Sequence, residues 1–209
     1  MATSYDQIAG RGLERLAALS DGVFAIAMTL LVLDIRSPAA EAIHSEQDLW
    51  HALVALSPRL LMYLMSFLTL GIFWVGQQTQ LNHLVRANRD LAWLHIAFLA
   101  AISLMPFSTA LLAEFVSYRI ALLVYWANVL IGGVALYATW IYAGRAGLVK
   151  PDTPAETSAA IGRRILVAQS LYAFGALLCV FDTYWSIAFI VLVQLNYAIA
   201  PRLPFLSRL

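Results

Sequence analysis

Cysteine, charged residues and catalytic motifs are all scarce in this sequence. Its 209 residues include a single cysteine, Cys179, which excludes an intramolecular disulfide and any cysteine-based metal cluster. No H-E-x-x-H, G-x-S-x-G or phosphate-loop pattern occurs, and the four histidines are not at metal-ligand spacings. We therefore expect that the protein is not an enzyme, that it holds no metal or other cofactor, and that it has no nucleic-acid partner.

Charge is the second deficit. Only 12% of the residues are charged and 62% are hydrophobic, whereas about 25% of an ordinary globular domain is charged. One soluble core cannot account for this excess of apolar residues. Uncharged apolar runs of about 18 residues or more are typical of membrane spans, and the class that this composition favours is a membrane protein.

The sequence predicts an all-α, polytopic membrane protein whose single domain covers residues 1–209. The apolar runs are continuous rather than alternating, which favours helices over the strands of a barrel. The stretch "RSPAAEA" after the first run resembles a signal-peptide cleavage region. However, that run is long for a signal peptide and contains an acid, so we expect it to be retained. The six predicted spans cover about residues 13–35, 60–78, 91–113, 120–144, 165–181 and 183–200.

The distribution of basic residues predicts the orientation of the chain. With the N-terminus in the cytoplasm, ten Lys and Arg residues fall inside and three fall outside, which is the expected positive-inside bias. Both termini are then cytoplasmic. The inside set is Arg11, Arg15, Arg86, Arg89, Arg145, Lys150, Arg163, Arg164, Arg202 and Arg208, and the outside set is Arg36, Arg59 and Arg119.

The first span, "LSDGVFAIAMTLLVLDI" in residues 19–35, contains an aspartate, Asp21. An acid at the centre of a span costs about 2.5–3.5 kcal/mol on insertion scales. We therefore expect Asp21 and the neighbouring Ser20 to point into the subunit's own helix bundle, where donors can satisfy them. The candidate donors are Arg15, Gln77, Gln78, Arg86, Arg89 and the indole of Trp74.

A second feature of the first span is an apolar stripe. At 100° per residue, Asp21 lies about 140° away from Ile26. One narrow face of the helix collects Ile26, Leu30, Leu33, Gly22 and Thr29. From periodicity alone this face fits the subunit core or the lipid, and nothing in its chemistry specifies a pore.

Two other functions fit parts of the pattern. Asp21 and His95 suit a secondary transporter or proton-coupled carrier, although the centres of spans two to six carry no Asp, Glu, Lys or Arg to mark a transport site. A membrane scaffold or enzyme would instead pack the stripe against helices of the same subunit. As an interhelical hydrogen-bonding residue, His95 would need no transport role.

Three stretches resemble the transmembrane protein 175 family of potassium channels. "RLAALSDGVFAIAMTLLVLDI" is similar to the family's first helix, whose signature is an arginine, three residues and then Phe-Ser-Asp. "LTLGIFWVGQQTQL" resembles the second helix, with its Trp and His pair, and "LAWLHIAFLAAISLMPFSTALLAEF" resembles the third. The matching signature residues are Arg15, Ser20, Asp21, Thr29 and Trp74.

The resemblance implies a function. Family members are potassium-permeable channels, and a single-repeat chain such as this one implies a homotetramer in a bacterial-type inner membrane, with K⁺ as the permeant ion. The first helices would line the pore, with Ile26 as the narrowest ring and Leu30 and Leu33 above it. Thr29 and Gly22 would support this constriction, and Asp34 would lie at the outer mouth.

The sequence departs from the family pattern at three positions. Gln77 and Gln78 stand where the family has histidines, so proton sensitivity based on histidine is not expected at these positions. Leu19 replaces the signature phenylalanine and removes an aromatic contact. Because apolar rings offer no oxygen to replace ion hydration, we expect only a modest preference for potassium over sodium.

Overall fold

A computed structural model describes residues 12–199. Within these residues the secondary structure is helical, apart from an isolated bridge between Leu84 and Val149. Arg11, Arg202 and Arg208, which contribute to the predicted orientation, lie outside the described residues, as do both chain ends. The α-helices are α1 (Leu13–Leu30), α2 (Glu46–Ala55), α3 (Ser57–Asn82), α4 (Arg89–Ser103), α5 (Met105–Glu114), α6 (Arg119–Arg145), α7 (Ala155–Leu177) and α8 (Thr183–Ile199). Short 3₁₀ helices are η1 (Leu31–Asp34), η2 (Ala40–Ala42) and η3 (Leu178–Val180).

Five segments are long and apolar enough to cross a membrane. They are Leu13–Asp34, Ser57–Asn82, Arg89–Glu114, Arg119–Arg145 and Ala155–Val180. The sixth predicted span corresponds to α8, a shorter apolar helix of 17 residues. At 1.5 Å per residue α8 is about 26 Å long, a little less than the roughly 30 Å of bilayer hydrocarbon.

The third predicted span is interrupted rather than continuous. α4 ends at Ser103, and α5 begins at Met105 with Pro106 in its first turn. Proline has no backbone N–H and cannot complete the helical hydrogen-bond ladder, which explains a break at this position. The fifth helix is longer than the predicted span of about residues 165–181, because α7 begins at Ala155.

Loops that were predicted to share a side of the membrane meet in the structure. At one end Arg59 forms an ion pair with Glu114 at 2.6 Å, and Arg119 donates to the carbonyl of Val180 at 3.0 Å. At the other end the α3–α4 and α6–α7 turns are joined through their backbones. The helices therefore run alternately between two ends, as the predicted topology requires.

The joined turns form a short clamp. Val85 N donates to Leu148 O at 2.9 Å, and Lys150 N donates to His83 O at 2.9 Å. Gly147, directly before Leu148, has a φ of +63°, a conformation that glycine adopts without a steric penalty. These two main-chain bonds fix the end of α3 relative to the end of α6.

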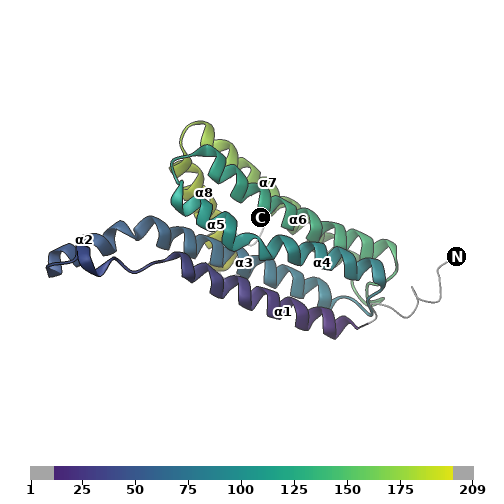
Figure 1. Ribbon diagram of the computed structural model, residues 1–209. Coiled ribbons are helices and arrows are strands. Elements are labelled where there is room, and N and C mark those ends of the chain that lie inside the picture. Colours follow the sequence, from purple (N-terminus) through teal and green to yellow (C-terminus); the bar gives the residue numbers. More distant parts are fainter. Residues whose placement is uncertain (1–11, 200–209) are drawn as a thin grey trace.

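α1 lies at one edge of the helix bundle, where it packs against α3 and α4 (Figure 1). α2 extends beyond the end of the bundle and makes few contacts with it. The centre of the bundle is formed by α3, α5 and α6, with α7 and α8 packed beside them. An edge position leaves one face of α1 free of contacts with the rest of its own subunit.

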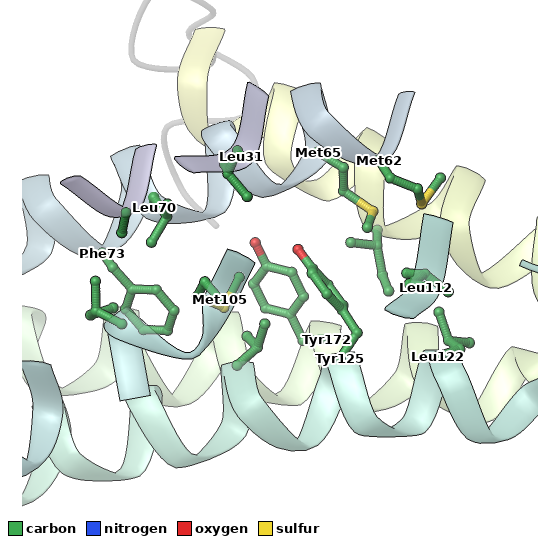
Figure 2. Close-up of a cluster of buried hydrophobic side chains, with 14 of the residues drawn as sticks. Leu31, Met62, Met65, Leu70, Phe73, Met105, Leu112, Leu122, Tyr125 and Tyr172 are labelled. Carbon is green, nitrogen blue, oxygen red and sulfur yellow. The ribbon is translucent and has the colours of Figure 1, made fainter. Parts of the chain in front are cut away.

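The bundle core contains polar as well as apolar side chains. Figure 2 shows the rings of Tyr125 and Tyr172 side by side among buried methionines and leucines. The Tyr125 hydroxyl bonds Thr69 Oγ1 at 2.9 Å, and Gln194 Nε2 donates to the same oxygen at 2.7 Å. These bonds tie α3, α6 and α8 together, because buried polar groups in a membrane protein need partners from neighbouring helices.

Candidate functional site: the two faces of the first helix

One face of α1 is buried within the subunit. Its residues recur at intervals of three and four, the spacing that places side chains on one side of a helix. Phe24 packs its ring against Phe98 of α4, with centroids 6.0 Å apart. The buried face consists of Leu16, Ser20, Phe24 and Ala27, and Leu31 of η1 extends it.

The opposite face of α1 is apolar and exposed. Ile26, Leu30 and Leu33 are 61%, 43% and 69% exposed, and Gly22 and Thr29 are also exposed. The five stripe residues therefore lie together on a surface that points out of the subunit. This arrangement contradicts the scaffold hypothesis, which required the stripe to pack against helices of its own subunit.

Thr29 is the one polar side chain on this stripe. Its Oγ1 donates within its own helix, at 2.9 Å from the carbonyl oxygens of Ala25 and Ile26. Because the hydroxyl proton is used locally, the oxygen lone pairs are the part of Thr29 available to groups outside the subunit. The stripe can thus offer weak acceptors beside Ile26 but no charge.

Ser20 begins a buried hydrogen-bond network between three helices. Its Oγ donates to Leu16 O at 2.8 Å and lies 2.6 Å from His95 Nε2 of α4. Gln77 Nε2 of α3 donates to the same Ser20 oxygen at 2.9 Å. The hydrogen-bonding role expected for His95 is confirmed, and the network fixes α1 against α3 and α4.

Asp21 bonds to α3 but is not buried. Its Oδ1 accepts hydrogen bonds from Trp74 Nε1 at 2.8 Å and from Gln78 Nε2 at 2.9 Å. Both donors were among the candidates, so that part of the expectation is confirmed. The prediction that Asp21 is buried inside the bundle is wrong, because Asp21 is exposed and its partner Trp74 is 40% exposed. The carboxylate lies on the flank of α1, between the buried face and the stripe, where two N–H donors compensate its charge.

The remaining predicted site residues lie apart from this network. Arg15 is exposed, and no described residue forms a hydrogen bond or ion pair with its side chain, so it does not partner Asp21 in this subunit. Asp34 is half-buried at the end of η1, one residue beyond Leu33. In the described part of the chain, no cluster of three or more His, Cys, Asp or Glu side chains could hold a metal ion.

The pairing of α1 with α3 contains a regularity that was not predicted. The adjacent residues Ser20 and Asp21 bond the adjacent residues Gln77 and Gln78, respectively. The sequence offered both pairs as polar dipeptides in facing spans, but it did not indicate which serine or acid meets which glutamine. A single register of α1 against α3 satisfies both bonds at once.

Comparisons with known proteins assign this architecture to a family. The model of the endosomal/lysosomal potassium channel TMEM175 family matches residues 15–106. A potassium channel of Streptomyces collinus is 38% identical over 154 residues, which cover 70% of this chain and 73% of the relative. The human endosomal/lysosomal proton channel TMEM175 is 37% identical over 98 residues, which cover 44% of this chain and 19% of that protein.

A solved structure gives the same result over nearly the whole chain. The crystal structure of a lysosomal potassium-selective channel TMEM175 homologue from Chamaesiphon minutus matches with a TM-score of 0.79 and 26% identity, covering 91% of this chain and 98% of that one. The family consists of ion channels rather than enzymes. By its signature residues, its sequence relatives and its fold, this chain belongs to the TMEM175 family of potassium channels.

Proposed function

We propose that the chain is one subunit of a homotetrameric, potassium-permeable channel in a bacterial-type inner membrane. Six helical segments cross the bilayer, with α8 as the sixth, and both termini are cytoplasmic. The whole chain, residues 1–209, acts as one channel domain without a cofactor. The α1 helices of four subunits surround a central axis and line the ion path.

The observation that carries this proposal is the exposed stripe of α1. Ile26, Leu30 and Leu33 lie on one face, about a helical turn apart, while the polar contacts of α1 lie on other faces. Membership of a channel family supports placing this face toward an axis rather than toward lipid. Four copies of the stripe would then form three successive apolar rings.

Ile26 forms the narrowest ring, with Leu30 and Leu33 on its outer side and Asp34 at the outer mouth. A narrow apolar ring controls conduction by dewetting, since it offers an ion no substitute for its hydration shell. Potassium loses less hydration free energy at such a ring than sodium does, because potassium is the more weakly hydrated ion. Thr29 oxygens beside the ring partly offset this loss, and Gly22 leaves room at the inner end of the stripe.

The signature network gives the stripe a fixed direction. Ser20, held by Gln77 and His95, and Asp21, held by Trp74 and Gln78, fix the rotation of α1 about its own axis. A rotation of one residue, about 100°, would replace Ile26 on the stripe by a neighbour of different size. Arg15 lies one to two turns before this network, near the inner end of the ion path.

Flux through purified protein tests the proposal. The protein is reconstituted in liposomes, and uptake of potassium and of sodium is measured side by side for the native chain and for Ile26→Asn. We expect measurable potassium flux, with a changed conductance or a changed ratio of potassium to sodium in the variant. Unchanged permeation in Ile26→Asn would remove Ile26 from the constriction.

A matched control is available on α6. Ile131 is 58% exposed but lies on a different helix, so Ile131→Asn introduces the same polar group away from the proposed axis. We expect it to leave ion selectivity unchanged. Equal effects of the two substitutions would indicate a general disturbance of the bilayer-facing surface and would count against a pore at α1.

Two further readouts address assembly and transport mode. Chemical crosslinking in detergent should trap species up to a tetramer, and crosslinking that stops at monomers would contradict the homotetramer. Single-channel recording should show unitary current steps. Slow, saturable exchange without such steps would instead favour a carrier that uses Asp21.

A further inference from the structure

A crevice lies between α3, α6, α7 and α8, on the side of α3 away from α1. Its volume is about 230 Å³. Exposed residues at its rim include Val75, Thr79, Ala160 and Arg164, and the inner wall includes the buried Phe73 and Ala168. The crevice therefore opens to the outside of the subunit and has a largely apolar interior.

The rim contains a cation that no described carboxylate neutralises. Arg164 lines the crevice, and its guanidinium lies over the ring of Tyr197 of α8, 5.4 Å from the ring centroid. A cation–π contact of this kind positions the side chain but leaves its N–H groups available for other acceptors. Asp and Glu are absent from the crevice lining.

The position of Arg164 along α7 corresponds to a membrane boundary. It directly precedes the apolar stretch 165–180, which spans about 24 Å as a helix and approaches the roughly 30 Å hydrocarbon thickness. Residues 155–164, before this stretch, carry most of the polar side chains of α7. The guanidinium thus lies where apolar crevice and polar surface meet, which is the level of lipid phosphates.

A buried amide inside the crevice also lacks a protein partner. The Oε1 atom of Gln169 is buried without a hydrogen bond to any described group, although buried side-chain polar atoms are normally paired. Gly133 of α6 makes room for this side chain, because a Cβ there would overlap Gln169 Nε2. The amide is therefore held in the crevice wall, about 7.5 Å along α7 from Arg164, and is not used by the protein's internal network.

We propose that this crevice binds one anionic glycerophospholipid. Its phosphate lies on Arg164, its glycerol-ester oxygens accept from the N–H groups of Gln169 Nε2, and part of an acyl chain fills the apolar interior beside Phe73 and Ala168. Basic pockets between transmembrane helices are suited to anionic headgroups, above all on the cytoplasmic side. The site rests on the proposed membrane topology and is independent of any role of Ile26.

An occupied crevice would also contact the helix that holds α1. Val75, Gly76 and Thr79 line it, and they alternate along α3 with Trp74, Gln77 and Gln78, which bond Asp21 and Ser20. The lipid and the residues that hold α1 would therefore lie on opposite sides of the same helix, α3. This lipid would stabilise α3 in the position from which it fixes α1.

Native mass spectrometry of the purified protein tests lipid binding directly. Dioleoylphosphatidylglycerol and dioleoylphosphatidylcholine, which differ only in the headgroup, are titrated onto the native chain, Arg164→Gln and Arg163→Gln. Arg163 is the adjacent arginine, which is also exposed but does not line the crevice. One cation near the surface contributes about 1 kcal/mol, so Arg164→Gln should bind phosphatidylglycerol about fivefold more weakly.

Arg163→Gln should retain the native preference for phosphatidylglycerol. Equal losses in the two arginine variants would show diffuse surface attraction and would overturn the site. Equal binding of the two lipids by the native chain would also overturn it, because the headgroup charge would then play no part.

Filling the crevice provides a second, charge-independent test. Ala160→Phe places a ring at the rim, whereas Ala159→Phe places the same ring on an exposed neighbour outside the crevice. We expect Ala160→Phe to lose phosphatidylglycerol binding and Ala159→Phe to keep it. Unchanged binding in Ala160→Phe would exclude the crevice, and loss of oligomers in that variant, with no lipid on the native chain, would show that a second copy of the chain covers it.

Discussion

The two faces of α1 are both largely apolar, unlike the faces of a helix in a water-soluble protein, and they differ in packing and hydrogen bonding. The face buried in the subunit contains Ser20, bonded to Gln77 and His95, whereas the exposed face carries Ile26, Leu30 and Leu33. In a bilayer, apolar side chains gain little by leaving lipid for protein, so van der Waals packing and interhelical hydrogen bonds determine which face turns inward. Exposed apolar residues of α1 are thus available for a task outside the subunit.

The strongest test of this difference compares two large side chains on opposite faces. Phe24→Ala removes a buried ring that packs on Phe98, and we expect it to lower the free energy of unfolding by about 3 kcal/mol, near the lower end for buried phenylalanines. Ile26→Ala should change the free energy of unfolding by less than about 0.5 kcal/mol. Denaturant unfolding in detergent micelles, followed by tryptophan fluorescence, measures both, and similar losses would contradict the assignment of the faces.

The flank of α1 provides an intermediate effect. Trp74→Phe removes the N–H that bonds Asp21 and leaves Gln78 as the other donor. Hydrogen bonds to charged groups contribute about 1.5–3 kcal/mol, and the exposure of Asp21 places the expected loss of unfolding free energy near 1.5 kcal/mol. The same substitution in an Asp21→Asn background should cost less, and strictly additive losses would show that the two side chains are not coupled.

The smallest expected effect concerns single hydroxyl groups. Ser20→Ala removes one hydroxyl from the buried network, and interhelical hydrogen bonds in membranes average about 0.6 kcal/mol and reach about 1.7 kcal/mol. Thr29→Val removes a hydroxyl that bonds only its own helix, so its effect on unfolding free energy should be smaller still. Micelle unfolding distinguishes the two, and a larger loss for Thr29→Val would reverse the proposed roles of the faces.

Most of the helical architecture could be predicted because long apolar runs report membrane spans directly. The exact positions of the break before Pro106 and of the start of α7 at Ala155 were harder to predict. The first depends on how the helices on either side of the proline pack. The second depends on polar residues that form a helix only where it continues into an apolar span, since short isolated helices are marginal in water.

The sequence predicted on which face of α1 each site residue lies, but not how far neighbouring helices bury it. Helical periodicity placed Ile26, Leu30 and Leu33 on one face, and the structure shows that face outside the subunit. It also placed Asp21 away from the stripe, yet an angle on a helical wheel does not reveal how far the neighbouring helix covers each position. Asp21 falls at the edge of that coverage, bonded by Trp74 but still exposed.

The clamp between the two turns at one end of the bundle restricts how such a channel could open. Val85 N donates to Leu148 O and Lys150 N donates to His83 O, and these bonds hold the ends of α3 and α6 together. α1 is not part of this clamp and is attached to α3 and α4 through side chains. A shift of α1 against the joined α3 and α6 would break only side-chain hydrogen bonds, those of Ser20 and Asp21, and no main-chain bond of this clamp.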